Sequence, residues 1–465
     1  MVFANLFFLY IFLPVNLILY YATRSYAVRN FVLVAMSFLF YAWGEPVWVL
    51  LLLASGFMVW LCSLLVERFA GTRRGKATLI LAVTISLSLL GIFKYSGFLI
   101  ENINAVLPLS LPVPQFSLPI GISFYTFQMI SYIVDVYRGD VKAQPSFLRF
   151  IMYVSMYFQL VAGPIVRYSD VAWEIDHRTA NANDISHGIT RFCIGLLKKV
   201  AVANVAGSLL VQYMDGDLTK VTVLGSWFGA VLFMLQIYYD FSGYSDMAIG
   251  LGQMFGFRFL ENFNYPFISR SITELWRRWH ISLGSWFRDY VYIPLGGSRV
   301  KTKHRLYLNI FVVWLLTGAW HGAKWTYIAW GMMYFVLLCA ERILGWSGKK
   351  TWYSWLYTIY FFVAGNVVFR SENVTGAIKY LLAMFNIHTS GLTDAKAVYY
   401  FAEYIPFLIM GIVAAMPIAV WLRSRTGRFK EVINRLYPIW CAAVFLVALS
   451  FVVKGGYNPF IYFDF

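Results

Sequence analysis

Two of the six histidines in the sequence lie in apolar surroundings, where an ionisable ring needs an explanation. His280 ends the run Trp276-Arg-Arg-Trp-His280, and His321 follows 41 residues later in Gly318-Ala-Trp-His321-Gly322. A neutral imidazole has a pKa near the pH at which cells work, so it can take a proton from an alcohol. His321 lies between the apolar run 306–320 and another that starts at Trp325. We therefore predict that His321 is the stronger candidate for a general base.

The two glycines beside His321 lack side chains and would leave room for a ligand to approach. The structural alternatives stay open: His321 as a packed, hydrogen-bonded histidine, and His280 as an imidazole that anchors an aromatic face. The remaining four histidines lie in polar or basic segments and are expected to be incidental: His177, His187, His304 and His388. No HExxH, P-loop, GxSxG or dinucleotide-binding motif is present, which argues against zinc protease, ATP-driven transport and α/β-hydrolase chemistry.

The segment that carries His280 has the pattern of an amphipathic helix. Ser271 and Glu274 have capping-box spacing, which predicts that a helix begins at Ser271. At about 100° per residue, His280 falls on one stripe with aromatic and apolar side chains. The other members of this stripe are Trp276, Trp279, Leu283, Trp286, Phe287, Tyr290 and Val291. The segment 258–305 is also basic, so we expect this helix to lie along a membrane face or to line a wet vestibule.

Five further residues are candidates for substrate contact: Trp276, Trp320, Arg277, Arg288 and Asp240. For the arginines, lipid or a neighbouring helix is the favoured partner, although a basic rim would suit an anionic thioester such as coenzyme A. Asp240 and Asp246 flank Gly243 in an otherwise apolar run. They either line a substrate or cation site, or satisfy a broken backbone and pair with arginines of other helices.

Composition identifies the type of protein. Hydrophobic residues make up 60% of the chain and charged residues 13%, with a mean hydropathy of +0.65, which is typical of a polytopic membrane protein. The net charge of +16 comes from Lys and Arg in short loops, so it indicates helix orientation and contact with lipid rather than nucleic acid. The four cysteines are far apart and form no CxxC pair, so we expect no metal site and no disulfide framework.

The apolar runs predict an all-α protein with about eleven to thirteen membrane elements, some of them re-entrant. The runs are 2–22, 30–43, 47–66, 77–99, 119–136, 147–165, 185–212, 221–255, 306–320, 324–345, 352–369, 400–422 and 436–453. Residues 3–21 follow no basic stretch and precede no cleavage site, so they are expected to stay as a helix rather than be removed. Gly163-Pro164 predicts a helix break. We predict one domain over residues 1–465, with the core motif region at about 236–331.

Basic residues fill the turns 24–29, 68–76 and 423–435, whereas the 44–46 turn and the 101–118 loop carry only acidic charges. By the positive-inside rule, this distribution predicts an N-terminus outside and a cytoplasmic 68–76 turn.

Several motifs together resemble the membrane-bound O-acyltransferase superfamily, and within it the bacterial alginate O-acetyltransferase branch. The most specific are Trp276-Arg-Arg-Trp-His280, Trp286-Phe-Arg-Asp-Tyr290, Tyr292-Ile-Pro-Leu-Gly-Gly297 and Trp320-His321-Gly322. Supporting motifs extend the resemblance over nearly the whole chain. They are Pro119-Ile-Gly-Ile-Ser-Phe-Tyr-Thr-Phe-Gln128, Tyr239-Asp-Phe-Ser-Gly-Tyr-Ser-Asp246, Glu261-Asn-Phe-Asn-Tyr-Pro266 and Phe460-Ile-Tyr-Phe463.

The resemblance implies that His321 is the catalytic histidine and that His280 is the second characteristic polar position. It also implies a ring of helices around a central tunnel, with short amphipathic helices, in a bacterial cell membrane. A thioester donor such as acetyl-coenzyme A would enter from the cytoplasmic side, with no bound cofactor or metal. The acceptor hydroxyl would belong to an exported or cell-wall polysaccharide, or to a serine of an exported O-acetyltransferase partner that hands the acetyl group on.

Two alternative functions stay open. A D-alanyl transferase acting toward teichoic acid shares the Arg-Arg-Trp-His and Trp-Phe-Arg-Asp-Tyr elements, although the 292–297 continuation and the 460–463 ending are more similar to the alginate branch. The other alternative is a transporter or flippase for an acyl carrier or a lipid-linked sugar, with the two histidines as proton-coupled sites. The sequence lacks the paired, broken helices in matching halves that are typical of such transporters.

Overall fold

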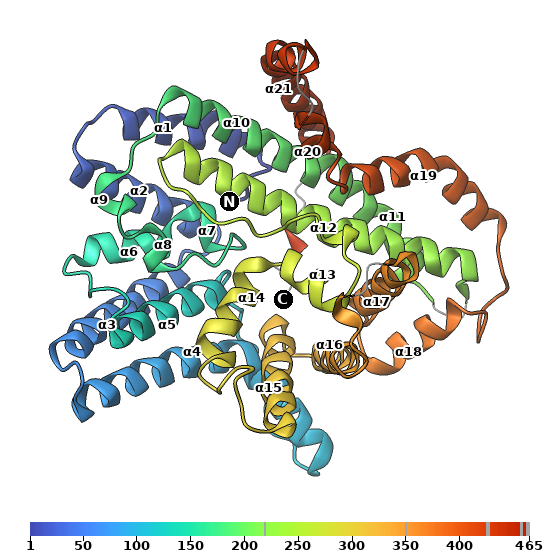
Figure 1. The fold of residues 1–465 in the computed structure, drawn as a ribbon, viewed down its shortest axis with the longest axis horizontal. Coiled ribbons are helices and arrows are strands. Elements are labelled where there is room, and N and C mark those ends of the chain that lie inside the picture. The colour runs from blue at the N-terminus through green and yellow to red at the C-terminus, as the bar shows by residue number, and fades with distance from the viewer. Residues whose placement is uncertain (218–219, 349–350, 425–427, 456–458, 462–465) are drawn as a thin grey trace. The chain divides into compact units, whose positions relative to one another are not determined.

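A computed structural model of the 465-residue chain describes all residues except 218–219, 349–350, 425–427, 456–458 and 462–465 (Figure 1). Part of the expected basic turn 423–435 and the last two residues of the 460–463 motif therefore lie outside the described residues. Within the described ranges, the regular secondary structure is helical and includes no strand. The chain groups into two compact units, Met1–Phe192 with Tyr244–Glu261, and Cys193–Gly243 with Asn262–Phe465. The single domain stays a prediction.

The first unit begins with a π-helical turn, η1 (Phe8–Phe12), that continues into α1 (Leu13–Tyr21). Long helices follow, and α3, α4 and α5 lie side by side (Figure 1). The helices of this part are α2 (Tyr26–Ala42), α3 (Trp48–Arg68), α4 (Arg73–Val106), α5 (Ile122–Arg138), α6 (Phe147–Ser155), α7 (Tyr157–Leu160), α8 (Tyr168–Val171) and α9 (Glu174–His177). Because α7 ends at Leu160 and residues 164–167 are not helical, the break predicted at Gly163-Pro164 is confirmed.

Helix α10 (Ala182–Leu197), the π-helical η2 (Lys198–Ala203) and α11 (Asn204–Met214) follow one another without a gap. Helix α12 (Val223–Met254) is continuous, so the backbone is not broken at Gly243 as one interpretation of the sequence required. The remaining elements are η4 (Pro266–Ile268), α13 (Ile272–Arg278), α14 (Ile281–Phe287), η5 (Arg288–Tyr292), α15 (Lys303–His321), α16 (Trp325–Ile343), η6 (Trp346–Gly348), α17 (Trp352–Arg370), α18 (Val374–Ala383), α19 (Ala395–Ala414), α20 (Ile418–Arg423) and α21 (Arg428–Lys454).

Every apolar run predicted from the sequence coincides with a helix or with consecutive helices. Five helical stretches of the described chain are long and apolar enough to cross a bilayer: Trp48–Arg68, Arg73–Val106, Ala182–Met214, Ala395–Ala414 and Leu436–Lys454. Shorter apolar helices occur at Phe8–Tyr21, Tyr26–Ala42 and Val374–Ala383. The expectation of a helical, multi-pass membrane protein is confirmed. The larger number of eleven to thirteen membrane elements and the central tunnel stay predictions.

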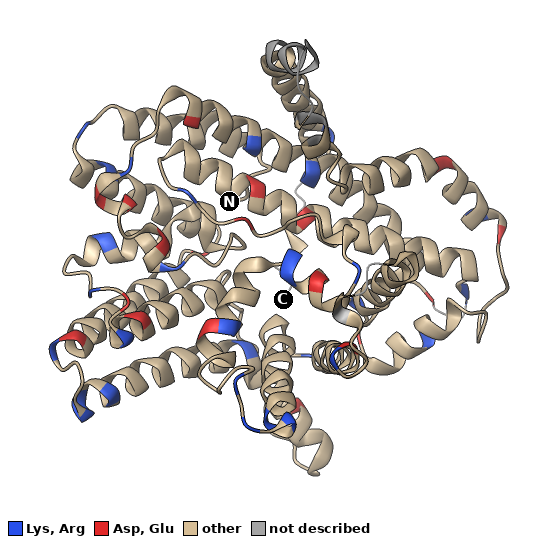
Figure 2. Ribbon diagram, viewed as in Figure 1, with Lys and Arg blue, Asp and Glu red and all other residues tan. Residues whose placement is uncertain are grey.

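The apolar spans turn much of their surface outward. Only 17% of the most apolar window of α4 is buried, and only 11% of that of α19. On α4, Ile80 and Leu81 are more than half exposed. Apolar surface of this extent is unfavourable in water and is satisfied by lipid chains. Figure 2 agrees, since most charged residues lie at helix ends and in connecting loops, while long stretches of helix carry none.

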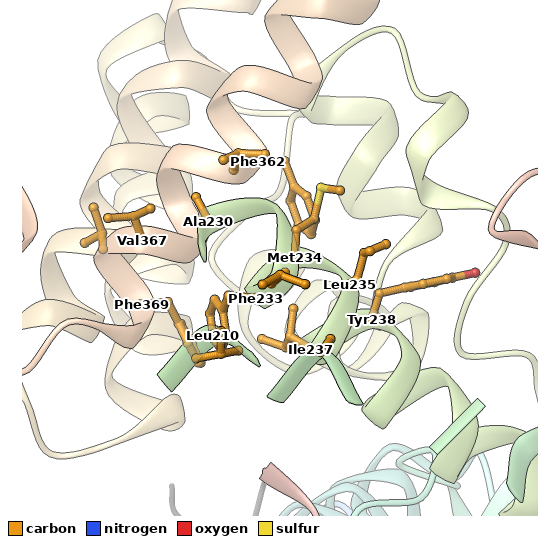
Figure 3. Packing of buried hydrophobic residues seen from close by; sticks show 14 of the residues in the cluster. Leu210, Ala230, Phe233, Met234, Leu235, Ile237, Tyr238, Phe362, Val367 and Phe369 are labelled. Atoms are coloured by element: carbon orange, nitrogen blue, oxygen red, sulfur yellow. The ribbon is translucent and has the colours of Figure 1, made fainter. Parts of the chain in front are cut away.

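The second unit has a dense apolar core. Helix α17 contributes Phe362, Val367 and Phe369 to this core (Figure 3). Helix α12 contributes the buried side chains of Phe233, Met234, Leu235, Ile237, Tyr238 and Tyr239. Helix α16 packs along both α15 and α17. This packing fixes the ends and faces of α15, α16 and α17, which carry the candidate catalytic side chains.

Candidate active site

His280 and His321 line the same cavity, which has a volume of about 560 Å³ and lies within the second unit. Residues of the six helices α12 to α17, of the α13–α14 turn and of η5 form its walls, and most of the lining side chains are apolar or aromatic. Besides the histidines, the lining includes Ile237, Trp276, Arg277, Trp279, Leu283, Phe287, Arg288, Val313, Trp314, Thr317, Trp330, Phe362, Asn366 and Phe369. The two histidines predicted from the sequence thus belong to one enclosed space.

The helix start predicted at Ser271 is confirmed. The Ser271 hydroxyl accepts a hydrogen bond from the Glu274 backbone N–H at 3.0 Å, and the Glu274 carboxylate accepts from the Arg270 N–H rather than from Ser271 itself. A second carboxylate completes the cap: buried Glu341 of α16 accepts from the backbone N–H groups of Ile272 and Thr273. The orphan donors of the first turn are therefore satisfied, and α13 is tied to α16.

The prediction of one uninterrupted amphipathic helix through His280 is wrong. Helix α13 ends at Arg278, and His280 adopts left-handed backbone angles (φ 47°, ψ 52°) as the N-cap of α14. After α14, residues Arg288–Tyr292 form a π-helical turn. A left-handed backbone is unfavourable for a residue with a Cβ and persists only where the surroundings enforce it. The predicted stripe nevertheless grouped His280 with Trp276, Trp279, Leu283 and Phe287, which line the same cavity.

Asn262 enforces this turn. Its backbone carbonyl accepts from the Ile281 N–H at 2.9 Å, and its side-chain oxygen accepts from the N–H and the hydroxyl of Ser282 at 3.1 and 2.9 Å. The same oxygen lies 3.2 Å from Nδ1 of His280. The motif Glu261-Asn-Phe-Asn-Tyr-Pro266, which the sequence showed without a role, thus holds the histidine turn.

The Asn262 contacts also assign the tautomer of His280. The Ser282 backbone N–H can only donate, so the Asn262 atom that it contacts is the amide oxygen. An amide oxygen can only accept, so Nδ1 of His280 carries the hydrogen and donates to it. In the neutral ring, Nε2 then holds the lone pair and acts as an acceptor.

The surroundings of His280 keep its ring neutral. Its imidazole lies edge-on to the ring of Phe241, with centroids 4.5 Å apart, and 5.9 Å from the indole of Trp320. Only 3% of the residue is exposed. Burial lowers the pKa of His280 well below its ordinary value of 6.5, and nearby His321 acts in the same direction. His280, which lies between two short helices rather than in a membrane span, is therefore suited to hold a hydrogen bond and not a charge.

His321 is the last residue of α15, and its ring is enclosed by aromatic side chains. The ring centroids of Trp320, Trp330 and Phe369 lie 5.0, 5.0 and 5.1 Å from that of His321. The carboxyl end of a helix carries partial negative charge, which favours a protonated imidazole there. Both rings are buried, but only His321 lies at the carboxyl end of a long helix, and this position favours its protonation over that of His280.

The expectation that Gly318 and Gly322 leave room for a ligand is wrong. A Cβ on Gly318 would lie 2.5 Å from the backbone oxygen of Tyr327, and a Cβ on Gly322 would collide with the Tyr327 ring. Both glycines instead allow α16 to pack closely against the end of α15. They fix the position of His321 rather than opening a path to it.

Of the other predicted site residues, three line the cavity and two do not. Trp276, Arg277 and Arg288 line the cavity with the histidines. Trp320 is buried and contacts both imidazoles, although it does not line the cavity itself. Arg288 forms an ion pair with Asp289 at 2.6 Å, which reduces its effective charge.

Asp240 lies outside the cavity lining and is part of a buried ion pair. Its carboxylate is 2.5 Å from Nζ of Lys199, with both side chains 2% exposed. It also accepts a hydrogen bond from the backbone N–H of Ile461 at 2.7 Å, while Lys199 donates to the Pro459 carbonyl. Asp240 is therefore a paired structural carboxylate rather than a lining residue, although its partner is a lysine and not the arginine that the structural alternative expected. Asp246 behaves similarly in the first unit, where it pairs with Arg191.

Asn366 is a site residue that the sequence interpretation missed. It lies on α17, one turn from Phe369 and one turn from Phe362, and these three residues share the face that lines the cavity. The signal was present, since Asn366 is the one amide side chain in the apolar run 352–369. The run was interpreted only as a membrane element.

Comparisons with known proteins identify the family of this chain. The profile of the membrane-bound O-acyltransferase family matches residues 140–385, more than half of the chain. The probable alginate O-acetylase AlgI of Pseudomonas aeruginosa is 43% identical over 403 residues, which cover 85% of this chain and 76% of the relative. The peptidoglycan O-acetyltransferase of Helicobacter pylori is 32% identical, covering 82% and 79%. The teichoic acid D-alanyltransferase of Bacillus subtilis is 30% identical, covering 50% and 61%. The chain therefore belongs to the membrane-bound O-acyltransferase family and is an O-acyltransferase.

Proposed function

We propose that this enzyme moves an acetyl group from a cytoplasmic acyl thioester to a hydroxyl, for O-acetylation of an exported or cell-wall polysaccharide. The observation that carries the proposal is the largely apolar cavity that both His280 and His321 line. A largely apolar lining excludes water and protects a thioester from hydrolysis. The relatives named as alginate O-acetylase and peptidoglycan O-acetyltransferase support acetyl transfer to a polysaccharide.

The chemistry requires one base and one leaving group. The acceptor oxygen attacks the carbonyl carbon of the thioester, and His321 takes the hydroxyl proton. The carbon–sulfur bond then breaks, and the proton passes from His321 to the departing thiolate. Nε2 of His280 is an acceptor in the assigned tautomer, so it orients the acceptor hydroxyl and does not donate to the developing oxyanion.

The donor is proposed to be acetyl-coenzyme A or another anionic acyl thioester. Arg277 lines the main cavity and also a second one of about 510 Å³, which shares Val313 and Trp314 with the first and includes Arg342. In the described part of the chain Arg277 takes part in no ion pair. Two guanidinium groups along this route suit the phosphates of such a donor.

The acceptor is proposed to be either the polysaccharide or a serine of an exported O-acetyltransferase partner that passes the acetyl group on. The enzyme is placed in a bacterial cell membrane with its N-terminus outside, since basic turns alternate with acidic ones along the first helices. The shorter alignment to the D-alanyltransferase supports acetyl over D-alanyl transfer, because it covers half of this chain.

Thiol release tests the proposal. The purified enzyme in detergent is incubated with acetyl-coenzyme A and a polysaccharide or partner acceptor, and free thiol and acetylated acceptor are both measured. The proposal predicts acceptor-dependent thiol release in equal amount to acetylation. Activity only with a D-alanyl thioester would establish the D-alanyl alternative. Movement of substrate across a vesicle membrane without any thiol release would indicate a transporter.

A further inference from the structure

Attack on a thioester puts negative charge on the carbonyl oxygen, and this charge needs a hydrogen-bond donor. In acyl transfer, such donors commonly supply one of the largest contributions to rate. Of the two histidines that line the cavity, His280 presents Nε2 as an acceptor, because its one N–H, on Nδ1, donates a hydrogen bond to the Asn262 oxygen. His321 is needed as the base. The donor must therefore come from a third group.

Asn366 has the properties of that donor. Only 4% of the residue is exposed, and it lines the cavity together with both histidines. Its Nδ2 is buried and makes no hydrogen bond within the described residues. A buried amide donor without a partner is unfavourable, so in a native protein it calls for a functional explanation. In the same helix the buried hydroxyl of Thr358 is satisfied by the Ser354 carbonyl.

The position of Asn366 on α17 supports the same role. Phe369 lies three residues after Asn366, and its ring centroid is 5.1 Å from that of His321. Phe362 lies four residues before Asn366, and its ring centroid is 5.0 Å from that of Trp279, the residue next to His280. Residues three and four apart share one helix face, so the amide lies between the two histidine-bearing walls. A half rotation of the amide exchanges its oxygen and nitrogen, so the group can turn its NH₂ toward a bound carbonyl.

We propose that Asn366 is a catalytic residue that donates a hydrogen bond from its amide to the thioester carbonyl oxygen and to the oxyanion formed from it. This inference rests on the proposed acetyl transfer. It adds a third group to the site: His321 as base, His280 as acceptor for the attacking hydroxyl, and Asn366 as donor to the oxygen that gains charge.

The test compares Asn366→Leu, which keeps the approximate size but removes the donor, with Thr358→Val on the same helix but outside the cavity lining. With acetyl-coenzyme A as donor, Asn366→Leu is expected to lower kcat about 10²–10³-fold with little change in KM, as loss of an oxyanion donor does. Thr358→Val is expected to keep wild-type kcat. Equal melting temperatures of Asn366→Leu and wild type separate the chemical role from a structural one.

A spectroscopic measurement gives a readout without turnover. Acetyl-coenzyme A labelled with ¹³C at the carbonyl is bound to the full-length His321→Ala protein, with and without Asn366→Leu. The inference predicts a carbonyl stretch at higher frequency once the amide is removed. An unchanged stretch together with wild-type kcat in Asn366→Leu overturns the inference while leaving acetyl transfer intact. If the wild-type enzyme releases no thiol from any acetyl thioester, the proposed function fails first and the inference with it.

Discussion

His280 and His321 both contact the indole of Trp320, whose ring centroid lies 5.9 Å from that of His280 and 5.0 Å from that of His321. The two imidazoles reach the cavity from different elements, one from a strained turn and the other from the end of α15. Their surroundings differ accordingly. His280 is held neutral and hydrogen-bonded, whereas His321 lies where a helix end favours a cation. This difference supports the proposed roles, with His280 as the acceptor for the attacking hydroxyl and His321 as the base.

Removal of the Asn262 side chain is expected to disturb the His280 turn. Asn262→Leu leaves the Ser282 N–H and the His280 Nδ1–H without their acceptor, and each buried unsatisfied donor costs about 1–3 kcal/mol. Asn262→Asp retains an acceptor oxygen and should lose less stability. Thermal unfolding in detergent and kcat are measured for both. Equal stability of Asn262→Leu and wild type would show that this residue does not hold the turn.

The lowered pKa of His280 predicts how stability changes with pH. At pH values below 6.5 the unfolded state binds a proton at this residue and the buried native state does not. Stability therefore falls as the pH drops from 7.5 to 5.5. His280→Asn, which tolerates the left-handed backbone, should weaken this dependence. The exposed control His388→Asn, also at a left-handed position, should leave it unchanged. Identical pH profiles for His280→Asn and wild type would contradict the argument.

The sequence predicted the helices well because the membrane elements are set by long apolar runs, which are local signals. It also predicted the start of α13, because Ser271 and Glu274 act within one helical turn. The break at His280 was missed because it depends on hydrogen bonds to Asn262, 18 residues earlier. The periodicity of apolar residues carries no information about such hydrogen bonds. Tyr327 filling the space beside Gly318 and Gly322 is likewise a tertiary contact.

The site could be predicted only in part, because the sequence shows which polar residues lie in apolar runs but not which partners they have in the fold. The two histidines stood out because ionisable rings are rare in apolar runs. Asp240 stood out equally, yet its partner Lys199 lies 41 residues earlier and its contact with Ile461 is 221 residues away. Only the fold separates a polar residue that opens on the cavity from one that is paired in the core.

The Lys199–Asp240 pair predicts a strong dependence on both partners. Lys199→Met leaves a buried carboxylate without its cation and is expected to cost about 3–5 kcal/mol, whereas the double variant with Asp240→Leu should cost clearly less than the two single changes together. The exposed pair of Lys220 and Asp217 serves as control, where Lys220→Met should change stability by less than about 1 kcal/mol. Unfolding in denaturant gives these energies. Additive effects at Lys199 and Asp240 would refute the coupling.

Gly318→Ala is expected to lower both stability and kcat. The added methyl group would press on the Tyr327 backbone, which cannot move without shifting α16 away from His321. Overpacking of this kind costs about 1–3 kcal/mol. Gly348→Ala, whose added methyl group would meet no atom of the described residues within 4 Å, is the control. Melting temperature and acetyl transfer are measured together. Wild-type values for Gly318→Ala would restore the view that this glycine leaves an open space.

The central claim is that His321 is the general base of acetyl transfer, and one measurement tests it most directly. Thiol release from acetyl-coenzyme A in the presence of acceptor is compared for wild type and His321→Ala, with membrane insertion and melting temperature measured on the same preparations. We expect a loss of about 10²–10⁴-fold in kcat with insertion and melting unchanged. Wild-type thiol release by a correctly inserted His321→Ala enzyme would contradict the claim.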